Sequence, residues 1–258
     1  MANFNKWCDR AVEKIDDHEI DLVSEQVGKR QIGIASVAAV VPGHYASTAR
    51  IAHVLRKLGK TKAAGFIAQK LPTSKNLRSG DLGEIVATSY VREFFPYTHA
   101  VNRLRWKDHR EMAMRGDDLI AVRQDAKSKR VEFLKGEVKS RVSLTAKVIS
   151  DARKALRKDN NRPSPHALSF IADRLYDQGE IAIADAIDEA QLKDGIKLSQ
   201  VQHLLFTFSE NNPLELLKAN LAAYNGNVAQ RTVGLFVDKH QKFIKAIYDK
   251  VIANGKHD

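Results

Sequence analysis

Acidic residues and a lysine interrupt two segments that otherwise have the composition of buried β-strands. The stretch RGDDLIAV carries Asp118, and FLKGEVKSR carries Glu137 and Lys139. Because alternate side chains of a strand share a face, Glu137 and Lys139 are predicted to point to one side and Val138 to the other. The short turn DAKSK makes the two strands predicted neighbours, with Asp118 close to Glu137.

Paired carboxylates of this kind favour a divalent cation. Like charges brought together in a partly buried place are costly unless something compensates them. Oxygen ligands suit Mg²⁺, with Mn²⁺ as a substitute. The pattern therefore indicates a metal site at Asp118 and Glu137, and places Lys139 to activate an attacking water or to stabilise charge on a phosphate. The alternative for a lone E-x-K pattern is an exposed strand face.

Glu84 is a further candidate, within the stretch GDLGEIVATSYVREFF. Apolar residues at helical spacing predict a helix from about 80 to 95, with Ser79 as its N-cap. Glu84 lies on a mostly apolar part of this helix, where a carboxylate needs a partner. The alternative is a surface residue paired with Thr88 or Arg92.

The charge of the chain predicts a polyanionic partner. The net charge is +11, and residues 99–163 hold 18 Lys and Arg against nine Asp and Glu. The interpretation is DNA binding that depends on salt and reads little sequence, and the alternative is a solvated basic face. Trp106 either stacks a base or packs in the core. The residues predicted to contact DNA are Arg103, Arg105, Lys107, Arg141, Lys147, Arg153 and Lys154.

The order of predicted elements indicates an α/β protein with helices packed on a mixed sheet. The apolar run 32–41 is predicted as a strand or buried segment that ends at Pro42. The helix at 80–95 is followed by strands at AVNRLRW, DDLIAVRQ and KRVEFLKGEVKS, a basic helix, two further helices and another strand. Residues 1–75 are predicted as an N-terminal extension packed on the core, and 76–258 as the main domain with a helical insertion around 164–194.

Several classes are disfavoured by composition. Cys8 is the only cysteine, so a cysteine metal cluster is excluded. The longest apolar run, of ten residues, is too short for a membrane helix, and the first residues lack a secretory signal, so we expect a cytoplasmic protein without a membrane partner. No Walker phosphate-binding motif is present in the sequence.

The order of elements and the charged residues resemble the PD-(D/E)xK nuclease superfamily. This resemblance implies an α-β-β-β-α-β core and DNA hydrolysis with Mg²⁺ held by Asp118, Glu137 and the carbonyl of Val138. Glu84 would hold a second ion or a water around the first, and Lys139 would activate the attacking water. Asp117 stands where the superfamily has proline, so both aspartates remain candidate ligands, and the apolar strand that follows favours Asp118.

Within that superfamily, LGEIVATSYVREFF, RGDDLIAV and FLKGEVKSR resemble the HamA family, the nuclease subunits of Hachiman antiphage systems. The resemblance extends over about residues 79–258 and implies a heterodimer with a HamB-like helicase that restrains the nuclease. The alternative hypothesis is a non-catalytic nucleic-acid-binding or regulatory adaptor module of a DNA-processing complex, and metal-dependent cleavage would separate the two.

Overall fold

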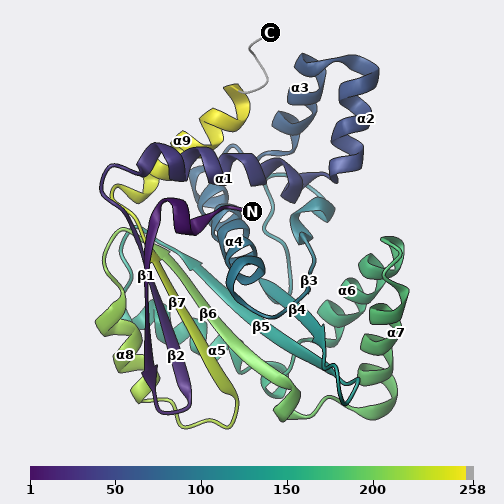
Figure 1. The fold of residues 1–258 in the computed structure, drawn as a ribbon, viewed down its shortest axis with the longest axis vertical. Coiled ribbons are helices and arrows are strands. Elements are labelled where there is room, and N and C mark those ends of the chain that lie inside the picture. The colour runs from purple at the N-terminus through teal and green to yellow at the C-terminus, as the bar shows by residue number, and fades with distance from the viewer. Residues whose placement is uncertain (254–258) are drawn as a thin grey trace.

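A mixed seven-stranded sheet forms the centre of the computed structural model, which describes residues 1–253 (Figure 1). The strand order is β1-β2-β7-β6-β5-β4-β3. Strands β2, β7, β6 and β5 run parallel, whereas β1, β4 and β3 pair antiparallel at the two sides. The strands are β1 (Cys8–Ile15), β2 (His18–Glu25), β3 (His99–Ala100), β4 (Leu119–Gln124), β5 (Val131–Ser140), β6 (Val201–Ser209) and β7 (Ala229–Phe236).

Helices cover both faces of the sheet (Figure 1). The largest apolar core joins one face to α1, α4 and α9, while α6 with α7 and α5 with α8 bury two smaller clusters. No helix within residues 1–253 has the length and apolarity needed to cross a membrane. The helices are α1 (Arg30–Tyr45), α2 (Thr48–Leu58), α3 (Lys60–Lys70), α4 (Lys75–Phe94), α5 (Ala146–Leu156), α6 (Pro165–Asp177), α7 (Ile181–Glu189), α8 (Leu214–Ala222) and α9 (His240–Ala253).

The N-terminal segment contributes to the sheet itself. Strands β1 and β2 form a hairpin, and β2 then pairs parallel with β7, so this segment extends the sheet by two strands. The prediction of a strand or buried segment at 32–41 was wrong as to the strand, because this run forms α1 and continues through Pro42 to Tyr45. Its buried residues recur every three or four positions, the spacing of a helix face.

Two boundaries near the predicted site also differ. Helix α4 begins at Lys75, and the hydroxyl of Ser74 caps it by accepting from the Leu77 amide at 3.3 Å. The predicted strand AVNRLRW is mostly a 3₁₀ turn at Arg103–Trp106, after the two residues of β3. The turn buries Leu104, while Arg103 donates to the main-chain carbonyl of Met114 in a loop and Arg105 donates to that of Gly43 in helix α1.

Candidate metal and nucleic-acid site

The candidate site lies where the pairing of β4 with β5 ends. The ladder stops at Leu119 and Gly136, and β5 continues through Ser140. A Cβ at Gly136 would lie 2.9 Å from the Cβ of Leu119, so glycine permits this close approach. Beyond the ladder, the amide of Val138 donates to Asp118 Oδ2 at 2.9 Å. This bond joins the first acidic motif directly to the second.

Glu137 and Lys139 form an ion pair on one side of β5, as the predicted alternation requires. Their side chains are 17% and 23% exposed, so the pair is largely shielded from water. Burial raises the pKa of Glu137, and the negative charge of Asp118 raises that pKa further, while the Lys139 ammonium opposes both effects. The pKa of Glu137 is thus raised first by burial and second by the neighbouring carboxylate of Asp118.

Glu84 approaches from helix α4, which packs closely on β5. A Cβ at the neighbouring Gly83 would lie 3.1 Å from side-chain atoms of both Val138 and Ser140. Arg103 Nε lies 3.0 Å from Glu84 Oε2, but neither atom has a hydrogen-bond partner within residues 1–253. Glu84 therefore holds a buried acceptor oxygen that is near a positive charge but is not hydrogen-bonded.

The electrostatic state of Glu84 reflects this burial. Its side chain is 15% exposed, and desolvation raises its pKa from 4.5 to about 8. The Arg103 guanidinium favours the charged carboxylate, whereas Asp118 and Asp81 disfavour it. The interaction with Asp118 places Glu84 within electrostatic reach of the first β-strand motif.

Asp117 is committed to different partners. Its Oδ1 lies 3.4 Å from the amino group of Lys135, and its Oδ2 accepts from the Ser164 amide at 2.9 Å. Lys135 is 1% exposed and also donates to the carbonyls of Lys158 and Arg162. These contacts tie Asp117 to the segment before α6, which leaves Asp118 as the better candidate for a metal ligand.

The chemistry of the site fits a hard divalent cation. Within residues 1–253, no three His, Cys, Asp or Glu side chains stand together in a ready ligand group. Instead, Lys139, Arg103 and an amide each face one of the carboxylates. Carboxylate oxygens and a main-chain carbonyl are ligands that Mg²⁺ accepts. The unbonded Oε2 of Glu84 is a buried acceptor that such an ion would satisfy.

A buried polar chain supports the end of β5, and the sequence alone did not indicate it. Ser140 Oγ lies 2.8 Å from Ser79 Oγ and 3.1 Å from His240 Nε2. Burial lowers the pKa of His240 to about 4. Ser79, predicted as an N-cap, thus lies inside α4 and links it through β5 to α9, and no local sequence pattern signals contacts between residues so far apart.

Four of the residues predicted to contact DNA point into the protein. Arg103 donates to the carbonyls of Asp117 and Met114, and Arg105 donates to that of Gly43. The amino group of Lys107 lies 2.7 Å from Asp81, with both side chains 5% exposed. Arg153 is 4% exposed and donates to Asn220 and Gln230. Their charges are committed to internal partners, so we no longer assign these four a contact with the DNA backbone.

The remaining predicted contacts lie on the surface. Arg141 is exposed directly after β5, and Lys147 and Lys154 lie on α5 with side chains 83% and 74% exposed. Both lysines pair with Asp151, an exposed ion pair that contributes little to stability. These three side chains remain available to a polyanion.

The fold and the site together define a mixed α/β protein with acidic residues and a lysine gathered at the end of its central strands. The chain belongs to the HamA family, whose model matches residues 2–251. It is also similar to the Hachiman protein HamA of Bacillus cereus, with 27% identity over 232 residues that cover 87% of this chain and 81% of the relative. The family match includes the first 75 residues, beyond the range of 79–258 expected from the motifs.

Proposed function

We propose that this protein is a metal-dependent deoxyribonuclease of the PD-(D/E)xK type. The observation that supports this proposal most directly is the hydrogen bond from the Val138 amide to Asp118, next to the ion pair of Glu137 and Lys139. Helix α4, strands β3 to β5, helix α5 and strand β6 follow the α-β-β-β-α-β order of that superfamily. The order and the clustered charges support the same proposal independently.

The proposed ligands of Mg²⁺ are Asp118, Glu137 and the carbonyl of Val138, with Glu84 as a further ligand. When bound, Mg²⁺ would neutralise charge on the phosphate and make water a better nucleophile. Lys139 now donates to Glu137. A cation held by Glu137 would share the charge of that carboxylate, and the amino group of Lys139 would then be available to orient the attacking water and to stabilise the phosphate.

The surface around the site would hold the DNA backbone. Arg141 follows Lys139 by two residues, and Lys147 and Lys154 extend the positive surface along α5. Lysine and arginine contacts to phosphates give affinity without sequence reading, and they weaken as salt rises. The proposed nuclease therefore recognises DNA mainly through its backbone.

We further propose that the protein is the effector of a Hachiman-type antiphage system and forms a heterodimer with a helicase. The family match and the printed name of the Bacillus cereus relative support this assignment. A nuclease with little sequence preference would damage its own cell, so a restraining partner is expected. Co-expression of the chain with its candidate helicase, followed by copurification, tests the heterodimer.

Incubation with DNA tests the nuclease. The purified chain, alone and with the candidate helicase, is mixed with linear and supercoiled DNA in Mg²⁺, Mn²⁺ or EDTA. We expect cleavage with either metal, loss of cleavage in EDTA, and loss in Glu137→Gln and Lys139→Ala. Conversion of supercoiled circles to nicked or linear DNA would identify endonucleolytic cleavage.

A matched control separates catalysis from general charge effects. Lys154→Ala removes a positive charge from the same surface without touching the motif, and it should retain cleavage when salt is low. DNA binding without cleavage under every condition, helicase included, would contradict the proposal and favour the non-catalytic binding module.

A further inference from the structure

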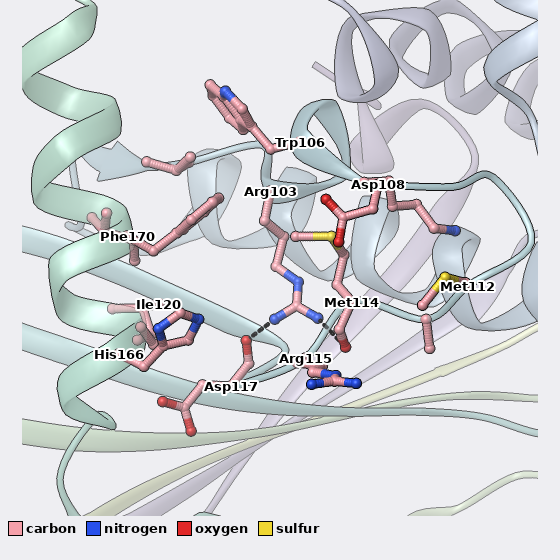
Figure 2. A pocket seen from close by; sticks show the side chains of 15 residues that line it. Arg103, Trp106, Asp108, Met112, Met114, Arg115, Asp117, Ile120, His166 and Phe170 are labelled. Carbon is pink, nitrogen blue, oxygen red and sulfur yellow. Dashed lines mark hydrogen bonds between the residues drawn. The ribbon is translucent and has the colours of Figure 1, made fainter.

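A pocket of about 390 Å³ opens beside the candidate site, between α6 and the segment that leads into β4 (Figure 2). Trp106 and Phe170 form its aromatic wall, Met112 and Met114 lie on the opposite side, and Ile120 lies at its base. Its volume falls within the range of roughly 300–1,000 Å³ that is typical of ligand pockets. The pocket is therefore large enough for a small organic group.

The aromatic wall is rigidly held. The rings of Trp106 and Phe170 meet edge to face, with centroids 5.8 Å apart. The Arg174 guanidinium lies 5.3 Å from the centroid of Trp106 and 5.5 Å from that of Phe170, and it pairs with Asp177 at 2.8 Å. Both rings are only partly buried, so they keep surface available for stacking.

Arg103 lines this pocket (Figure 2) and also lies 3.0 Å from Glu84 of the candidate metal site. Its side chain lines the pocket, donates to Met114 and to the carbonyl of Asp117, and approaches Glu84 through Nε. Asp117 also lines the pocket and directly precedes Asp118 in the chain. The pocket and the proposed metal site thus share the Arg103 side chain and the Asp117–Asp118 segment.

The charged groups of the lining favour a nucleotide over a purely apolar ligand. Within residues 1–253, neither Arg115 nor Asp108 forms an ion pair or a side-chain hydrogen bond, and both are exposed. Arg115 suits a phosphate, whereas the carboxylate of Asp108 repels phosphate and suits the amino group of a base. Aromatic rings stack on any base, since each base has a π-face.

We propose that this pocket binds one unpaired base of the DNA strand that is cleaved, stacked against Trp106. The inference rests on the proposed function in that it places the backbone of the same strand at Asp118. A base inside a duplex is already stacked and paired, so it would have to leave the duplex to enter. The pocket therefore favours single-stranded or locally opened DNA.

Tryptophan fluorescence in EDTA tests this proposal without cleavage. The chain has two tryptophans, and Trp7 is fully buried, so Trp106 is the one that a ligand can reach. The probes are a deoxycytidylate 12-mer and an abasic sugar-phosphate 12-mer of equal charge. We expect the base-bearing oligomer to quench Trp106 and to bind about tenfold more tightly than the abasic oligomer.

Matched variants assign the signal. Trp106→Phe should keep the affinity but lose the quenching, Trp106→Ala should lose about tenfold in affinity, and Trp7→Phe should retain the quenching. Thermal unfolding of each variant verifies that it is folded. Equal binding of the two oligomers, or unchanged affinity in Trp106→Ala, would overturn the proposal. Binding of free deoxycytidine monophosphate as tightly as the 12-mer would also overturn it.

The two proposals fail separately. Asp118→Asn should abolish cleavage and leave the preference for the base-bearing oligomer intact. An absent preference alongside metal-dependent cleavage would remove the base pocket and keep the nuclease. A clear preference for the base-bearing oligomer without any cleavage would keep the base pocket and remove the nuclease.

Discussion

Replacement of Glu84 by glutamine removes a buried ionisable group from the centre of the proposed site. In the folded chain its pKa is about 8, because burial and the nearby Asp118 and Asp81 disfavour the carboxylate. In the unfolded chain the ordinary value of 4.5 applies. Between these two pH values the folded state holds the proton more strongly than the unfolded state, so stability falls as pH rises through this window. Because glutamine does not titrate, the stability of Glu84→Gln should not show this decline with rising pH.

The size of the effect follows from the two pKa values. Each pKa unit corresponds to 1.36 kcal/mol, so the displacement from 4.5 to about 8 corresponds to at most about 5 kcal/mol. Between pH 5.5 and 8.5 the same linkage gives about 3 kcal/mol. Glu84→Gln should therefore gain stability relative to the parent chain by about this amount as pH rises over that range.

Urea unfolding in EDTA measures this difference at pH 5.5 and 8.5. Glu215→Gln is the control, because its carboxylate is 86% exposed. A difference between Glu84→Gln and the parent chain that is the same at both pH values would refute the reasoning. Added Mg²⁺ should reduce the decline in the parent chain, because a cation at the site favours the charged form of Glu84.

Three further substitutions test the supporting structure and the proposed DNA surface. Gly136→Ala should lose about 1–3 kcal/mol in thermal unfolding, because the new Cβ meets Leu119, and unchanged stability would show that β4 and β5 can separate without loss. Lys107→Met should lose about 3–5 kcal/mol in urea unfolding, because the buried Asp81 carboxylate keeps its hydrogen bond from Tyr45 but loses its ion-pair partner, and the additional change Asp81→Asn should restore part of the lost stability. Lys154→Ala should reduce the slope of the logarithm of DNA affinity against the logarithm of salt concentration by about one, measured by fluorescence anisotropy. An unchanged slope would show that Lys154 does not belong to the DNA surface.

The central arrangement was predictable because it is local. Two strands joined by a connection of only six residues, 125–130, are expected to be neighbours, and the alternation of a strand fixes the common face of Glu137 and Lys139. The Leu119–Gln124 and Val131–Ser140 strands accordingly match the predicted segments closely. The sequence also singled out Glu84, since a carboxylate among apolar helix residues requires a partner.

The sequence did not predict which basic side chains are exposed and which bind partners inside the protein, because this depends on contacts between residues distant in sequence. Lys107 pairs with Asp81 and Arg153 with Gln230, and neither partner lies in the same local element. Composition alone therefore overstated the exposed positive surface. The run 32–41 was ambiguous for a related reason, since a short apolar segment fits a buried strand and a buried helix equally well, and packing against α9 decides for the helix.

Direct detection of the metal tests the central claim most sharply. Mn²⁺ gives an electron paramagnetic resonance signal that reports free ion, and it substitutes for Mg²⁺ at oxygen sites. We predict that the parent chain binds Mn²⁺, that Asp118→Asn and Glu137→Gln lose this binding, and that Lys139→Met retains it while losing DNA cleavage. Equal Mn²⁺ binding by the parent chain and both carboxylate variants would contradict the account.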